Sequence, residues 1–212
     1  MALMHQTTMT PSKLELLAAW LPSQPWFVGD ANSLVSLGGF RLDDPAGEVG
    51  LEGILLTAGD DTVYYVPLSY RGAPLEGGAD FLVGTSEHGV LGTRWISDAA
   101  GDPVFRSVMA ATIATGGHQA DEFVQDESGN RVSRQPAVRV QGSGRPGDQA
   151  PELAEATVEQ VGPLTRVSDD LAVLDIVRVV DPALVARDDQ YALRASWGEH
   201  DGQAILALLY AG

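Results

Sequence analysis

The chain has 212 residues, of which 44% are hydrophobic and 20% are charged, proportions typical of a globular protein with a substantial core. Its net charge of −16, from 29 acidic and 13 basic residues, disfavours binding to nucleic acids and to anionic lipid surfaces. The absence of cysteine excludes disulfides, thiolate metal sites and thiol nucleophiles. We therefore expect neither a nucleic acid nor a membrane among its partners.

The N-terminal region predicts a cytoplasmic protein. Residues 1–15 lack the charged-then-apolar pattern of a secretory signal. No apolar run approaches the ~20 residues that a membrane-spanning helix needs.

The first predicted element is a short amphipathic helix after Pro11. Ser12 is expected to be its N-cap, and Glu15 follows three residues later, which is the spacing of a capping box. Pro22 and Pro25 are expected to end the helix, because proline cannot continue one.

The next hundred residues predict antiparallel strands and a second helix. Strands are expected at 33–42, 50–58 and 62–70, with two more within 79–97 around a turn at 86–89. Pro67 predicts an edge position or a bulge in the third strand. Asp102 is expected to cap a helix over 104–114, with Pro103 at its first position.

The second half of the chain begins with a change of composition. Residues 126–151 are rich in Gly, Pro, Ser and Gln and predict a flexible connection, in which 136–140 is a candidate short strand. Strands are then expected at 155–161, 164–168, 171–180, 191–197 and 204–211. The Asp-Gly pair in the turn at 199–202 favours a hairpin between the last two strands.

This pattern predicts an α+β protein with two lobes. One domain is expected over 1–120, a connection over 121–151 and a second, β-rich region over 152–212. The chain lacks the regular βαβ alternation of a doubly wound sheet.

Three stretches together resemble the maltokinase N-terminal cap family. They are 20–27 (WLPSQPWF), 64–71 (YYVPLSYR), and the series within 82–104 that includes EHGVLG and RWISD. Their order and spacing cover roughly residues 12–116. The resemblance implies a cystatin-like cap, in which a curved antiparallel sheet cradles a helix. The chain departs from the family where Pro25 and Asp30 replace basic residues.

More faintly, the second half resembles the small lobe of the kinases that carry this cap. Glu159-Gln160 and 177–182 (VRVVDP) are the matching stretches. Where those kinases present a nucleotide-binding lysine, this chain offers Leu174 or Asp175, and an aspartate would repel ATP phosphates. No H-x-D-x-x-x-x-N catalytic loop occurs in the 212 residues. We therefore expect no kinase activity and no cofactor.

Other candidate chemistry has simpler structural explanations. The four histidines, His5, His88, His118 and His200, show no metal-ligand spacing, so no metal site is expected. Ser86, Glu87 and His88 contain the groups of a nucleophile site, but neighbours in sequence seldom converge in that geometry, which favours a polar hairpin turn.

Six side chains are candidates for contact with a ligand or partner: Trp26, Phe27, Tyr64, Tyr65, His88 and Trp95. The aromatic rings could stack on a sugar. At these positions in strands and at helix ends, however, packing in the core is the favoured interpretation.

The leading functional hypothesis is a non-catalytic, cap-like protein that acts through protein contacts. The resemblance points to a sugar kinase or an α-glucan enzyme of trehalose, maltose or glycogen metabolism as the partner, with a homo-oligomer as the other option. The alternative hypothesis is a small-molecule binding module on the concave face of the cap sheet, lined by Trp26, Tyr64, Tyr65 and Trp95.

Overall fold

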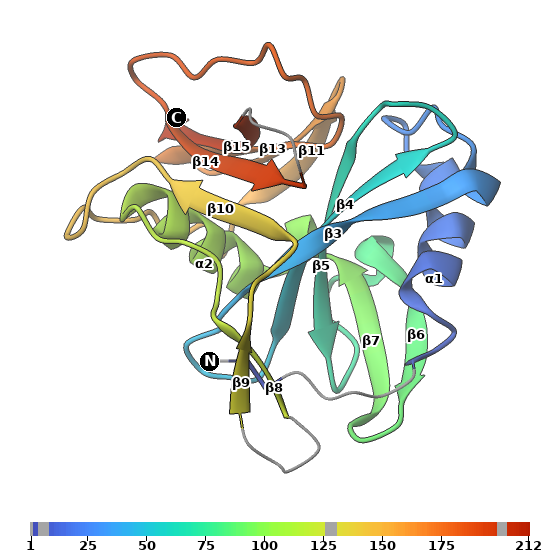
Figure 1. Cartoon of the computed structure of the whole chain (residues 1–212). Coiled ribbons are helices and arrows are strands. Elements are labelled where there is room, and N and C mark those ends of the chain that lie inside the picture. The colour runs from blue at the N-terminus through green and yellow to red at the C-terminus, as the bar shows by residue number, and fades with distance from the viewer. Residues whose placement is uncertain (1, 4–8, 126–130, 199–202) are drawn as a thin grey trace.

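A computed structural model describes residues 2–3, 9–125, 131–198 and 203–212. Within these residues the strands form two six-stranded antiparallel sheets and a smaller three-stranded sheet, accompanied by two α-helices (Figure 1). The predicted α+β class is confirmed. No helix in this described part is long and apolar enough to cross a bilayer.

The first sheet curls into a half-barrel against helix α1 (Lys13–Trp20) (Figure 1). Its order is β2-β6-β7-β5-β4-β3. The strands are β2 (Met9–Thr10), β3 (Leu34–Leu42), β4 (Gly50–Ala58), β5 (Tyr64–Arg71), β6 (Leu82–His88) and β7 (Gly92–Asp98). The predicted arrangement of a helix on a curved antiparallel sheet is confirmed.

Local capping explains where α1 begins. The Ser12 hydroxyl accepts a hydrogen bond from the Glu15 amide, and the Glu15 carboxylate accepts one from the Ser12 amide at 2.7 Å. The predicted capping box is therefore confirmed. Leu17 and Leu21 are fully buried against the first sheet, so the helix is held by the core as well as by its cap.

The second sheet is covered on one face by helix α2 (Pro103–Ala114). Its order is β10-β14-β15-β13-β12-β11. The strands are β10 (Val138–Gly142), β11 (Thr157–Val161), β12 (Leu164–Ser168), β13 (Ala172–Val177), β14 (Tyr191–Trp197) and β15 (Ala204–Ala211). Asp102 caps α2 and Pro103 opens it, as predicted. The expected hairpin turn at 199–202 lies outside the described residues.

The segment expected to be a flexible connection contains paired strands. Besides β10, it holds β8 (Glu122–Gln125) and β9 (Arg131–Arg134), which form the small sheet with β1 (Ala2–Leu3). Gly144 then passes directly over the end of α2, where its amide donates to the Ile113 carbonyl at 3.0 Å. The glycines that indicate a linker in the sequence instead permit a close backbone approach.

The two sheets are joined at β5. Strand β7 pairs only with 68–71 of β5, so the first half of β5 has a locally free edge where Pro67 lies. Pro67 lies beside this local edge, but β5 is not the edge strand predicted, because it lies between β7 and β4. Residues 178–180 occupy that edge: the Tyr65 amide donates to the Arg178 carbonyl at 2.9 Å, and the Val180 amide donates to the Val63 carbonyl at 2.8 Å.

Candidate functional site

Most of the aromatic side chains expected to contact a ligand lie in the core. Trp26 exposes 4% of its surface, and Tyr64 and Tyr65 expose none. The ring centroids of Trp26 and Tyr64 lie 6.2 Å apart, and those of Phe27 and Tyr64 lie 5.0 Å apart. Tyr65 stacks on Phe40 at 6.0 Å in the core that the two sheets share. Core packing, the interpretation that the sequence favoured, describes these residues.

The remaining two candidates lie on the β6–β7 hairpin, where Trp95 and His88 are half-buried. The His88 Nδ1 atom accepts hydrogen bonds from the amides of Val90 and Leu91 at 3.3 and 3.1 Å, so the imidazole caps the turn. The turn spans 89–91, three residues later than its predicted start, because β6 continues through His88.

The Ser86, Glu87 and His88 groups do not assemble into a nucleophile site. The Ser86 hydroxyl donates to the Pro11 carbonyl at 2.7 Å, and the Glu87 carboxylate accepts from Thr93 at 2.6 Å. These bonds hold the N-terminal segment and the hairpin in place. Among the described residues, no group of three His, Asp or Glu side chains could hold a metal ion.

Asp175 is held in a structural ion pair. It is 3% exposed and accepts hydrogen bonds from Arg166 at 2.8 and 3.0 Å and from the Tyr210 hydroxyl at 2.8 Å. Burial, followed by this hydrogen bond, raises the pKa of Tyr210. Leu174, the other candidate for the lysine position, is fully buried in the core. Neither side chain offers a cation to a nucleotide.

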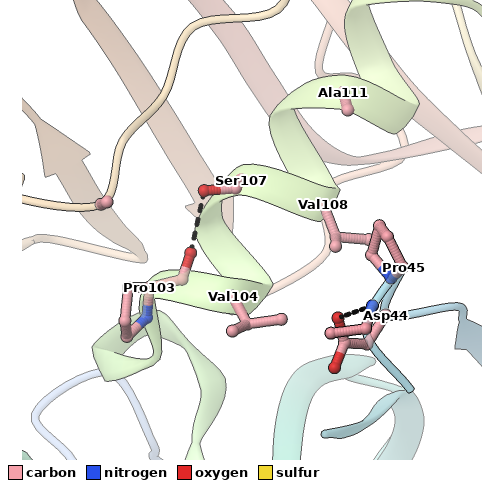
Figure 2. Close-up of a pocket in the computed structure, with 9 residues that line it drawn as sticks. Asp44, Pro45, Pro103, Val104, Ser107, Val108 and Ala111 are labelled. Carbon is pink, nitrogen blue, oxygen red and sulfur yellow. Dashed lines mark hydrogen bonds between the residues drawn. The ribbon is translucent and has the colours of Figure 1, made fainter. Parts of the chain in front are cut away.

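An open, mostly apolar hollow lies along the outward face of α2, and we call it the α2 groove. Its volume is about 510 Å³. The loop between β3 and β4 forms one wall, and Figure 2 shows Pro45 on this loop facing Val108 of the helix. The lining residues are Asp44, Pro45, Ala46, Pro103, Val104, Ser107, Val108, Ala111 and Ala154.

The side of helix α2 that lines this groove is uncharged, because the one charged residue of the helix points inward. Arg106 is 6% exposed and donates to the carbonyls of Ala100 at 2.7 Å and Ala156 at 2.9 Å. Burial lowers the pKa of Arg106, although nearby Asp102 and Glu155 act in the opposite direction. The outward face of a surface helix normally carries polar or charged residues, so the uncharged lining of this groove departs from the usual pattern.

The opposite wall is fixed by Asp44. Its carboxylate accepts hydrogen bonds from the amides of Ala46, Glu48 and Val49 at 2.9–3.0 Å, which closes the β3–β4 loop. Partial burial acts to raise the pKa of Asp44, but these bonds outweigh it and hold the pKa below its ordinary value. Pro45 is therefore presented to α2 by a well-defined turn.

Acidic side chains border the groove. Glu48 belongs to the loop that forms one wall, and Glu152 and Glu155 flank Ala154 on the other side; all three are exposed. The nearby cation Arg71 is bound to Asp102 by two hydrogen bonds of 2.7 Å. The rim of the groove is therefore negatively charged.

Most of the first sheet belongs to a known domain family. Residues 20–102 match the family model of the maltokinase N-terminal cap domain. This segment is a maltokinase N-terminal cap domain. The match ends at the N-cap of α2, so the cap domain supplies the β3–β4 wall of the groove and the following residues supply the helix. The rest of the chain has no family assignment, and the chain matches no curated protein sequence.

Sequence reasoning identified α2 but not its groove. The available signal was the run VFRSVMAATIA, in which Arg106 is the one charged residue. Without knowing which side of the helix packs on the sheet, the sequence could not show whether that arginine faces solvent. The β3–β4 loop also comes from a part of the chain about sixty residues away, so its approach to α2 was not predictable from local pattern.

Proposed function

We propose that the chain is a cytoplasmic, non-catalytic protein that acts by binding a protein partner, a maltokinase or another α-glucan enzyme of maltose, trehalose or glycogen metabolism. The observation that carries this proposal is a maltokinase cap domain joined to a second sheet. In that sheet Asp175, the candidate for the nucleotide-binding position, is paired with Arg166. Such a chain retains the accessory part of the kinase pattern, and at the position where the kinases present a lysine it has an aspartate that is already paired with an arginine.

The placement of the one lysine supports a non-catalytic role. Phosphoryl transfer depends on cations that hold the phosphates and on a positioned base. Lys13 lies on α1, and its ammonium group donates to both carboxylate oxygens of Glu52 at 2.7 and 2.9 Å. The side chain is thus bound to β4 of the first sheet, whereas Asp175 lies on β13 of the second sheet.

The α2 groove supports a role in protein contacts. Its lining is dominated by proline, valine and alanine side chains, which gain from removal from water but offer no specific hydrogen bonds. Both polar side chains in the lining are already engaged, since Ser107 donates to the Pro103 carbonyl at 3.0 Å and Asp44 closes its own loop. A sugar needs partners for its hydroxyls, so the small-molecule alternative has less support.

Two assays on the purified chain test this proposal. The first measures phosphate transfer from ATP and magnesium to maltose, and we expect none above background. The second measures binding to the maltokinase of the same organism by isothermal titration calorimetry, with an unrelated acidic protein of similar size as control. Maltose phosphorylation by the chain alone would contradict the non-catalytic role. Failure to bind the maltokinase would reject that enzyme as the partner.

A further inference from the structure

We infer that the α2 groove binds an amphipathic helix of the partner protein, with apolar side chains in the groove and lysines or arginines against its acidic rim. This inference rests on the proposed function and adds the surface and the chemistry of the bound segment. Of the groove, only the β3–β4 wall belongs to the matched cap segment. Helix α2 and the wall that contains Ala154 lie outside it.

Helix α2 is long enough to pack along a second helix. Helix α2 has 12 residues and so a length of roughly 18 Å, about three helical turns. Val104, Val108 and Ala111 recur at helical spacing along its open side, and each is only partly buried. Small side chains in such a row let a second helix approach to the usual interaxial distance of about 8–10 Å.

The side chains that line the α2 groove favour apolar contacts at its centre. Ser107 and Asp44 already hold hydrogen bonds within the chain, so a ligand with polar groups at the centre would lose its own hydration without replacement. Leucine, isoleucine or methionine side chains on one face of a helix meet this requirement. This is the helix-in-groove mode of recognition.

The charge of the rim favours basic residues on both sides of the apolar face of the bound helix. Glu48, Glu152 and Glu155 are exposed beside the two walls, whereas the cation Arg71 is bound to Asp102. A second copy of this chain would bring the same acidic rim and a net charge of −16 to the contact, so like charges would oppose self-association through this face. A partner with basic flanks gains attraction instead.

A model peptide tests the inference without the kinase. The probe is a fluorescein-labelled synthetic helix with a leucine face flanked by lysines, and the comparison peptide carries glutamates in place of the lysines. Anisotropy titrations with the full chain should show roughly tenfold or greater preference for the lysine peptide. That preference should shrink as the NaCl concentration rises from about 0.05 M to about 0.3 M. Equal affinity for the two peptides would overturn the inference.

Groove and rim variants locate the binding. Val108→Arg blocks the groove, and Glu152→Lys combined with Glu155→Lys reverses the rim; each should weaken binding of the lysine peptide roughly tenfold or more. Matched controls are Val185→Arg, at a side chain that is 78% exposed and outside the groove, and Asp188→Lys beside it. Weakening by the controls equal to that by the groove variants would overturn the inference.

Folding and function are separated by two further measurements. Circular dichroism melting identifies folded variants, and Ala111→Arg replaces Val108→Arg if that variant fails to fold. The same variants are then titrated with the maltokinase. If the maltokinase binds wild type and groove variants equally, the groove inference fails while the proposed function stands. If the lysine peptide binds the groove but the maltokinase does not bind the chain, the inference that the groove takes a basic amphipathic helix stands. The maltokinase is then rejected as the partner.

Discussion

Arg178 and Asp98, 80 residues apart in the sequence, form a buried ion pair that joins the second sheet to the cap domain. The arginine Nη2 atom donates to the two carboxylate oxygens at 2.8 and 2.6 Å, and its Nε atom donates to Thr165 at 2.7 Å. The guanidinium carbon also lies 5.3 Å from the ring centre of Trp26. Because Arg178 is fully buried, this contact constrains how the two sheets sit against each other.

Removal of Arg178 should destabilise the whole chain. Arg178→Met leaves Asp98 buried without its partner, and we expect a loss of about 3–5 kcal/mol in the free energy of unfolding, measured by urea denaturation. The control is Arg187→Met, which breaks an exposed ion pair with Asp189 and should cost about 0–1 kcal/mol. The double variant Arg178→Met with Asp98→Asn should recover part of the loss. Equal losses for Arg178→Met and the exposed control would contradict a structural role for the pair.

Arg106 should hold the wall of the groove that contains Ala154. Its guanidinium donates to the Ala154 and Ala156 carbonyls at 3.2 and 2.9 Å. Arg106→Met should therefore cost about 2–3 kcal/mol and accelerate amide hydrogen exchange in residues 152–156. Arg139→Met, at an exposed position on β10, is the control. Unchanged exchange in 152–156 would show that other contacts hold this segment.

Gly144 should tolerate no side chain. A Cβ atom there would lie 1.8 Å from the Ala114 carbonyl oxygen, which is backbone and cannot rotate away. We expect Gly144→Ala to lower the free energy of unfolding by roughly 1–3 kcal/mol, as measured by chemical denaturation. At Gly72 a Cβ would meet only the end of the Arg94 side chain at 3.3 Å, so Gly72→Ala is the matched control. Equal stability of the two variants would mean that α2 and β10 can move apart freely.

Glu122 should make stability depend on pH. It is 7% exposed, and burial raises its pKa above the ordinary 4.5, although Arg134, Arg41 and Lys13 act to lower it. The folded state therefore binds this proton more tightly than the unfolded state. The stability that it contributes is fully present below pH 4.5 and is lost as the pH rises through the pKa of the folded state.

Glu122→Gln mimics the protonated carboxyl and removes this dependence. At neutral pH the variant should melt at a higher temperature than wild type, and below pH 4.5 the difference should vanish. Scanning calorimetry across this range measures the effect, with Glu76→Gln at an exposed loop position as control. A variant less stable than wild type at neutral pH would show that the Glu122 charge is needed by the neighbouring cations.

Much of the local structure follows from the sequence, because caps, turns and alternation act over a few residues. Ser12 and Glu15 identified the start of α1, Asp102 and Pro103 identified the start of α2, and the spaced aromatic motifs identified the cap family. The strands that were predicted were also located within a few residues, but β8 and β9 were missed because their segment has the composition of a linker. The β6–β7 turn was placed too early because a polar pair at the end of a strand has the same composition as a turn.

Only the tertiary structure decided which surfaces are covered. It placed α2 on the second sheet, buried Tyr64 and Tyr65, brought Arg178 to Asp98, and set the β3–β4 loop against the open side of α2. Each of these outcomes depends on residues far apart in the chain. Sequence pattern states that a side chain is apolar or charged, but burial and pairing depend on what the rest of the fold brings within a few ångströms of it.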